Sequence, residues 1–313
     1  MISDYSTAQR PGLDLMNFCV KYIINFLLCC LSLLTVYVAV GDDRVGALRF
    51  GKPVKVGVLS DDDIRESSGL ARSLSLPGAF WTHNDSGDDP RLYLIDGEGR
   101  TLTTADVRGA EAVDWEDICS FRRAGTNYLL VGDIGGNAVS RKTRVLYLIK
   151  EPSIDSKHVD ELRKLEVDQT IPFKFDGEQP DCESLAFDPL SEAILLTSKP
   201  IGLTCQVYQL ALPVKSETEP LLAKPIATLR IAAPTAMDVS SNSKQAVICT
   251  YLGVYLFERE GDESWSDAFG QTPTWISLPL RKQGESVCFG ADCKSILLTS
   301  EGKKQPLWKV PAE

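Results

Sequence analysis

One short pattern recurs five times along the chain and constrains its fold more than any other feature. In each copy a polar residue is followed by a small or polar one, an apolar one and a small one. The copies stand at residues 68–71, 116–119, 183–186, 235–238 and 285–288. They follow one another at intervals of roughly 50 residues, with one longer interval that contains an insertion, and such a period is typical of repeated small β-sheets.

Two apolar segments follow each copy of the pattern. The first covers residues 79–83, 128–132, 193–197, 245–249 and 295–299, and the second covers 91–95, 145–149, 206–210, 253–257 and 306–310. The second segment always has a tyrosine or tryptophan at its centre. Continuous β-branched and aliphatic runs of this length indicate strands that are buried on both faces. Helix is expected only in the apolar N-terminal segment and at residues 156–165.

A fourth strand is expected after most copies, at residues 101–107, 170–175, 226–231 and 274–278, but none follows the last copy. Residues 53–59, which precede the first copy, can pair beside residues 306–310 and leave no exposed sheet edge there. The sequence therefore predicts an all-β fold, a β-propeller of five blades whose ring is closed by the N-terminal strand. Six blades are the alternative if residues 150–180 contain further strands.

An uncharged apolar run covers residues 22–40, with Lys21 just before it and Asp42 and Asp43 just after it. Its length is close to the lower limit for a membrane-spanning helix, and residues 39–41 offer the small side chains that a signal peptidase reads. We expect residues 1–41 to be a signal peptide, or alternatively a membrane anchor that is not cleaved. Residues 42–313 would then be a propeller domain outside the cytoplasm, secreted or periplasmic, or anchored to the membrane by residues 22–40.

The chain is acidic, with 33 Lys and Arg residues against 43 Asp and Glu residues and a net charge of -10. This charge disfavours nucleic acid as a partner. The expected partners are a small anionic ligand or another protein, the membrane is contacted only through the N-terminal segment, and the protein is expected to be a monomer. The cysteines beyond residue 41 permit disulfides, but small buried thiols fit the pattern equally well. These cysteines are Cys119, Cys182, Cys205, Cys249, Cys288 and Cys293.

Polar residues are predicted to gather at one end of a central channel. In a blade the innermost strand is antiparallel to the second, so the start of the first strand and the end of the second lie at the same rim. First strands begin with Ser68, Glu116, Glu183, Thr235 and Glu285, and second strands end near His83, Asp85, Asp133, Lys199, Tyr251 and Glu301. Taken singly, each of these is an ordinary rim or turn residue.

Together, the repeat-equivalent carboxylates of Glu116, Glu183 and Glu285 would repel one another unless a cation neutralised them. We predict a divalent cation, Ca²⁺, held by these three residues and Asp133, because calcium takes oxygen ligands in flexible geometry. The glycine-rich loop at residues 132–137, together with Arg141, could hold an ion beside an anionic group. Alternatively, an ion pair between Asp133 and Arg141 fixes a structural loop.

The motifs taken in order resemble those of a family of secreted, largely uncharacterised bacterial β-propellers related to phytase-like or esterase-like propellers. They are SGLA (68–71), WTHNDSGD (81–88), DWEDI (114–118), GDIGGN with Arg141 (132–141), ESLAFDP (183–189), TSK (197–199), TY (250–251), GES (284–286) and TSEG (299–302). The resemblance implies a propeller with a cation-dependent activity on phosphate or other esters. Phytase propellers use additional carboxylates and a cluster of basic residues for phosphate. Here only Arg141, Lys199 and Arg144 are available, which departs from that pattern.

Two functions are consistent with these residues. Because no nucleophile can be identified, the first is a binding module that uses a calcium-loaded channel mouth to recognise a ligand or partner. The alternative is a metal-dependent hydrolase, phytase-like or lactonase-like. In that case His83 or Asp85 would be the general base, and Arg141, Lys199 and Tyr251 would contact the anionic substrate.

Overall fold

The computed structural model describes residues 49–313 except residues 86, 137–140, 200–201 and 217–218. The expected signal peptide or anchor therefore lies outside the described residues. Within the described part, no helix has the length and apolar character needed to span a membrane.

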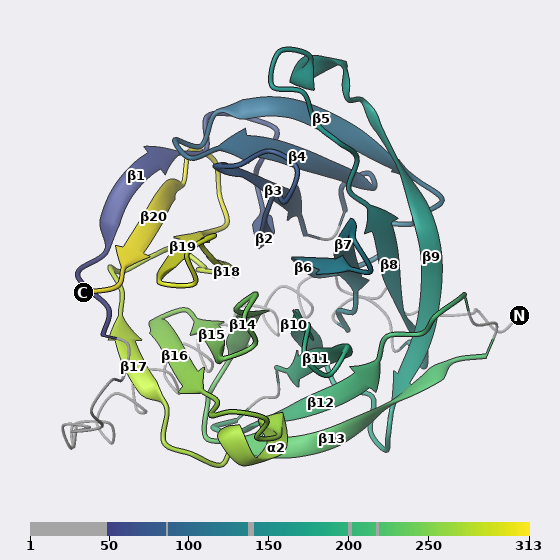
Figure 1. The fold of residues 1–313 in the computed structure, drawn as a ribbon, viewed down its shortest axis with the longest axis vertical. Coiled ribbons are helices and arrows are strands. Elements are labelled where there is room, and N and C mark those ends of the chain that lie inside the picture. Colours follow the sequence, from purple (N-terminus) through teal and green to yellow (C-terminus); the bar gives the residue numbers. More distant parts are fainter. Residues whose placement is uncertain (1–48, 86, 137–140, 200–201, 217–218) are drawn as a thin grey trace, which may run out of the picture.

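The strands form four-stranded antiparallel units that follow the sequence repeat. The first three units are β2 (Ser67–Arg72), β3 (Ala79–Asn84), β4 (Arg91–Asp96) and β5 (Thr101–Arg108); β6 (Trp115–Arg123), β7 (Thr126–Asp133), β8 (Arg144–Lys150) and β9 (Lys164–Phe175); and β10 (Cys182–Asp188), β11 (Ala193–Ser198), β12 (Cys205–Ala211) and β13 (Leu221–Leu229). The fourth unit is β14 (Pro234–Val239), β15 (Gln245–Thr250), β16 (Gly253–Glu258) and β17 (Thr274–Ser277), and the fifth is β18 (Ser286–Phe289), β19 (Ser295–Thr299), β20 (Pro306–Pro311) and β1 (Val54–Val58). Figure 1 shows the units around a common centre, with the first strand of each unit innermost. The predicted all-β class is confirmed, and the arrangement is consistent with a β-propeller.

The N-terminal strand completes the last unit, as the sequence predicts. β1 pairs antiparallel with β20, with Val54 opposite Lys309 and Val58 opposite Pro306. The first described strand thus lies beside the last one (Figure 1). This pairing covers the edge of β20 that would otherwise expose unpaired backbone groups.

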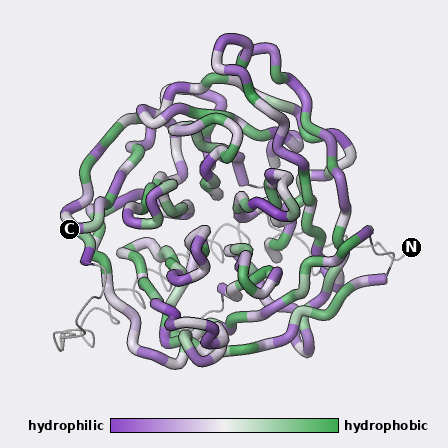
Figure 2. The backbone as a smooth tube through the Cα atoms, in the orientation of Figure 1, coloured by the Kyte–Doolittle hydropathy of each residue, from purple (hydrophilic) through white to green (hydrophobic). Residues whose placement is uncertain are grey.

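The long interval between the second and third copies of the repeat is explained by β9. This strand pairs with β8 in its own unit, and its two ends pair in parallel with β5 and β13 of the neighbouring units. The helix expected at residues 156–165 is wrong. Only the 3-10 turn η1 (Val159–Glu161) forms there, because none of its residues is buried and the chain from Lys164 onward pairs with β5. In Figure 2 this segment is a largely hydrophilic loop, whereas hydrophobic residues lie along the strands.

Hydrophobic contacts hold neighbouring units together all the way round. Each of five buried clusters combines side chains from two adjacent units. The cluster that joins the fifth unit to the first, for example, packs Leu297 and Leu307 against Leu70 and Phe80. Since burial of apolar surface is the main stabilising contribution to folding, these interfaces fix the positions of the inner strands.

The cysteines of this region are free thiols rather than disulfides. Cys119, Cys182, Cys205, Cys249 and Cys288 are buried, and Cys293 is half-buried. The interpretation as small buried side chains therefore holds for the five buried cysteines, which pack within the hydrophobic clusters. Burial raises the pKa of the Cys119 and Cys288 thiols well above the ordinary value, which makes them poor nucleophiles.

Candidate functional site

The polar residue that opens each repeat lies at an irregularity in the sheet. The pairing of the first strand with the second shifts register at Ser68, Glu116, Glu183 and Thr235 in the first four units. A β-bulge of this kind bends the strand and re-aims a side chain. In the fifth unit, Glu285 immediately precedes β18. The repeat therefore places a polar side chain at the start of every inner strand.

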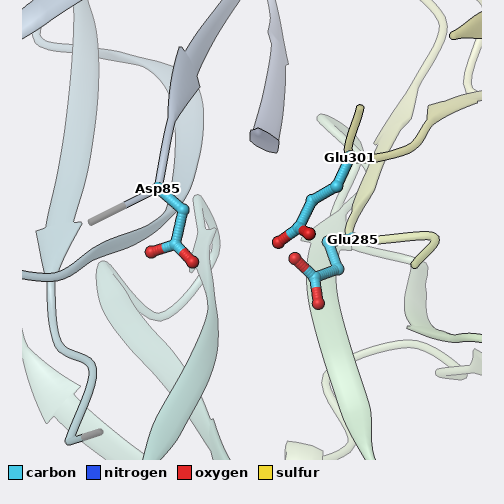
Figure 3. A group of neighbouring side chains, drawn as sticks. All are labelled: Asp85, Glu285 and Glu301. Atoms are coloured by element: carbon cyan, nitrogen blue, oxygen red, sulfur yellow. The ribbon is translucent and has the colours of Figure 1, made fainter. Parts of the chain in front are cut away.

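Seven carboxylate groups gather where these strands begin. They form three groups, each with one oxygen per residue within 4.8 Å of the others: Asp85, Glu285 and Glu301; Asp85, Asp114 and Glu116; and Glu116, Asp181 and Glu183. In the first group, Glu285 and Glu301 face Asp85 (Figure 3). Because Asp85 and Glu116 each belong to two groups, the seven residues form one cluster, which we call the acidic mouth. It confirms that Glu116, Glu183 and Glu285 lie at the same end of the inner strands.

Two buried carboxylate oxygens of the acidic mouth lack a hydrogen-bond partner in the described part of the chain. Glu116 is 1% exposed and Glu183 is 3% exposed, and one carboxylate oxygen of each, Oε1, is buried without a hydrogen-bond partner in the described part of the chain. A buried carboxylate in this state is costly unless it is protonated or paired. Burial, and then the charges of Glu183 and Asp85, raise the pKa of Glu116 well above its usual value. Burial and the nearby Glu183 raise the pKa of Asp181 to about 6.

Lys199 is the cation that the structure places within this cluster. Its Nζ lies 2.8 Å from Glu183 Oε2 and 3.9 Å from Glu285 Oε1, and it stands over the ring of Tyr251 at 5.5 Å. The Tyr251 hydroxyl donates a hydrogen bond to Glu285 Oε1 at 3.1 Å. Burial alone would lower the pKa of Lys199, but the neighbouring carboxylates raise it well above its usual value. This ammonium group thus lies within 3.9 Å of two of the seven acidic-mouth carboxylates in the described chain.

The stability of the metal-free protein is expected to depend on pH because of these carboxylates. A carboxyl group whose pKa is raised on folding stabilises the fold below its unfolded-state pKa, and this contribution is lost as the pH rises through the folded-state value. For Asp181 that window runs from about 4, the usual value for Asp, to about 6. Melting temperatures in a chelator should fall as the pH rises through this range. If the melting temperature of the wild-type chain changes with pH as little as that of Asp181→Asn, the expectation is contradicted.

The glycine-rich loop contacts the acidic mouth through its backbone. The amide of Gly136 donates to Asp181 Oδ1 at 2.8 Å. A Cβ added at Gly135 would collide with Glu116 Oε1 and Asp114 Oδ2, so only glycine lets the loop approach these two carboxylates. The same loop was expected to contribute Asn137, which lies outside the described residues.

Asp133 and Arg141 form an ion pair with each other beside the acidic mouth. Arg141 Nη1 lies 2.6 Å from Asp133 Oδ1, and its Nη2 donates to the carbonyl oxygen of Gly135 at 3.0 Å. Asp133 also accepts a hydrogen bond from the amide of Asp114 at 3.0 Å. Asp133 belongs to none of the three carboxylate groups in the described chain. The geometry favours the alternative that this pair fixes the loop, and their roles as metal ligand and substrate-binding residue stay predictions.

His83 is buried beside the acidic mouth. Its ring packs edge-on against Trp115, and its Nδ1 donates to the carbonyl oxygen of Asn84 at 2.8 Å. The other nitrogen, Nε2, faces the backbone of Gly69, where an added Cβ would lie 2.7 Å away. Burial lowers the pKa of His83 to about 4, so the ring is neutral. Its role as a base stays a prediction, and the half-buried Asp85, a member of two carboxylate groups, is better placed for it.

Four carboxylates of the acidic mouth were not predicted as ligands: Asp85, which was predicted as a base, and Asp114, Asp181 and Glu301. Asp114 and Asp181 each stand two residues before the glutamate of the repeat, in the sequences Asp-Trp-Glu and Asp-Cys-Glu. This shared spacing was available in the sequence. Glu301 had been noted only as the end of a second strand.

Comparisons with known proteins leave the family of this chain open. No protein-family model and no curated protein sequence matches it. Among solved structures, it is similar to a gluconolactonase from Xanthomonas campestris, with 12% sequence identity and a TM-score of 0.48 over 85% of this chain and 95% of that one.

Proposed function

We propose that this protein is a five-bladed β-propeller that binds a calcium ion at the acidic mouth and uses the loaded site to recognise a small anionic ligand or a protein partner. One observation carries the proposal: Glu116 Oε1 and Glu183 Oε1 are buried, lack hydrogen-bond partners among the described residues, and belong to one group of carboxylates with Asp181. These oxygens need a cation or a proton. Residues 1–41 would deliver the propeller to the secreted or periplasmic space or anchor it there, where millimolar calcium suits a site of moderate affinity.

The donor set favours calcium over other common metals. The three groups consist of carboxylates alone, and none of them contains a histidine or cysteine from the described residues, as zinc sites do. Calcium accepts six to eight oxygens at irregular angles, whereas magnesium requires a nearly ideal octahedron. Carboxylates that come from five different strand ends and loops fit the irregular geometry of calcium more readily than the octahedron of magnesium. The group of Glu116, Asp181 and Glu183 contains both of the buried oxygens that lack a hydrogen-bond partner among the described residues, and it is our principal site.

Cation binding would also change the role of Lys199. In the structure its ammonium group is held by Glu183 and Glu285. When a cation neutralises these carboxylates, Lys199 is free to contact an anionic ligand, with Tyr251 beside it. The binding function therefore depends on the ion in two ways, through direct coordination and through release of this lysine.

The test is to measure calcium binding by the full chain, purified in detergent because of its apolar N-terminal segment. Elemental analysis should find calcium in the purified protein, and calorimetry after chelation should show one binding event that magnesium matches only weakly. Calcium at about 100 times its Kd should stabilise the fold by about 2.7 kcal/mol. A chain that retains no metal and whose melting temperature is unaffected by calcium would refute the proposal.

Hydrolysis is the second candidate, and the position of Asp85 favours it. Asp85 is half-buried and belongs to two carboxylate groups, one of which shares Glu116 with the principal site. There it can accept a proton from a water molecule, while Lys199 orients an anionic ester. A bound calcium ion would supply Lewis acidity and charge neutralisation. Turnover of a phosphate-ester or lactone panel that is lost in Asp85→Asn, with calcium affinity retained, would establish this role; no turnover by the wild-type chain would exclude it for these substrates.

A further inference from the structure

A cavity lies at the opposite ends of the inner strands from the acidic mouth. It has a volume of about 340 Å³. Its lining includes residues at or near the C-terminal ends of all five inner strands, among them Arg72 on β2, Phe187 on β10 and Phe289 on β18. The strands thus carry the acidic mouth at their starts and this cavity, which we call the distal cavity, at their ends. A volume of this size suits a small molecule.

The charge of the distal cavity is opposite in sign to that of the acidic mouth. Its charged lining residues in the described chain are Arg72, Arg122 and Asp238, and burial raises the pKa of Asp238 to about 7, so the two arginines outweigh its negative charge. Asp238 is held by the backbone, because its oxygens accept the amides of Val239 at 2.9 Å and Phe289 at 2.8 Å. The guanidinium groups of Arg72 and Arg122 have no ion pair or side-chain hydrogen bond with any described residue. Two arginines that outnumber one aspartate favour a singly charged anion.

The remaining lining provides an apolar wall and a few polar groups. Phe121 and Phe187 stack with their ring centroids 3.7 Å apart, and both line the cavity with Phe289. Ser120 and Ser241 add hydroxyl groups at the rim. Small-molecule sites commonly combine an apolar wall with a few convergent polar groups.

We propose that the distal cavity binds a small organic monocarboxylate. The planar fork of Arg72 holds the carboxylate through two parallel hydrogen bonds, and Arg122 adds a second positive charge. The aromatic or aliphatic body of the ligand packs against the phenylalanine wall. Inorganic phosphate fits less well, since its second negative charge would face Asp238. This site does not use the calcium-binding residues, so it stands or falls separately from the proposed function.

The test uses 4-fluorobenzoate as the probe and the full chain in detergent, followed by fluorine NMR. The wild-type chain should broaden the probe signal, and unlabelled benzoate should compete, whereas benzyl alcohol and inorganic phosphate should not. Arg72→Gln should weaken binding at least tenfold, as expected for the loss of a charge-assisted hydrogen bond in a partly buried site. Arg72→Lys should recover only part of the affinity, because an ammonium group lacks the fork.

Control experiments distinguish probe binding in the distal cavity from probe binding to detergent, to the protein surface or to the acidic mouth. Arg108→Gln removes an arginine from the outer strand β5 and should leave probe binding unchanged. Arg122→Gln, at an exposed position, gives a second test if Arg72→Gln unfolds. Chelation of calcium should not alter probe binding. The proposal is overturned if the wild-type chain shows no binding at about 10 mM probe, if the Arg72 and Arg108 variants bind alike, or if phosphate competes better than benzoate.

Discussion

Replacing Glu116 with glutamine should abolish the stabilisation by calcium and yet raise the melting temperature of the metal-free protein. The substitution removes a principal ligand, and even the loss of an outer-shell partner typically costs 10–100-fold in metal affinity, so we expect a loss of roughly 100-fold or more. Without calcium, however, the wild-type side chain is a buried carboxylate with a raised pKa, surrounded by Glu183, Asp85 and Asp114. Glutamine has the same shape and no charge to bury.

The opposite signs of these two effects make the experiment decisive. A glutamate with a purely structural role would lower the melting temperature on substitution, with or without calcium. Glu98→Gln is the matched control, because Glu98 is an exposed glutamate that pairs with Arg100 on the surface. It should leave both the calcium affinity and the metal-free melting temperature unchanged. A wild-type calcium response in Glu116→Gln would remove the acidic mouth as the metal site.

The second and third strands of each unit could be predicted from the sequence because they are apolar runs, and the third has an aromatic residue at a repeated position. Residues 295–299, for example, were expected as a strand and form β19 with the same bounds. The failure at residues 156–165 has a physical reason. A helix at a protein surface needs an apolar face to bury, and the turn that forms there buries none of its residues.

The end of the inner strands at which the polar residues lie was predictable from the sequence, but the residues that they contact were not. Antiparallel pairing alone brings Glu116, Glu183 and Glu285 to one end of the inner strands. The bulges that re-aim two of these side chains depend on strand register, which the sequence does not reveal. Likewise, the position of Asp133 at the end of a second strand suggested a ligand, but an arginine eight residues further on, Arg141, takes it up in an ion pair. Such a pair depends on the path of a loop.

The largest loss of stability is expected from breaking the buried ion pair between Asp188 and Arg259. Arg259 Nη1 and Nη2 lie 3.0 Å and 3.0 Å from the two carboxylate oxygens, and the two side chains are 0% and 3% exposed. The pair joins the end of β10 in the third unit to the residue that follows β16 in the fourth, and the guanidinium also stacks on Trp265 at 4.5 Å. Asp188→Asn leaves a buried arginine uncompensated, which typically costs 3–5 kcal/mol. Urea denaturation of the wild type and the variant would measure this difference.

The same pair predicts a pH dependence of the opposite sign to that of the acidic mouth. Burial alone would raise the pKa of Asp188, but hydrogen bonds from Arg259 and Ser191 lower it below its usual value. Its stabilising contribution is therefore complete above the unfolded-state pKa of about 4 and is lost as the pH falls further. Lys150→Gln, which breaks an exposed pair with Asp168, is the control and should leave the urea midpoint unchanged. If Asp188→Asn behaves like this control, the ion pair does not hold the third and fourth units together, and their shared hydrophobic cluster must do so alone.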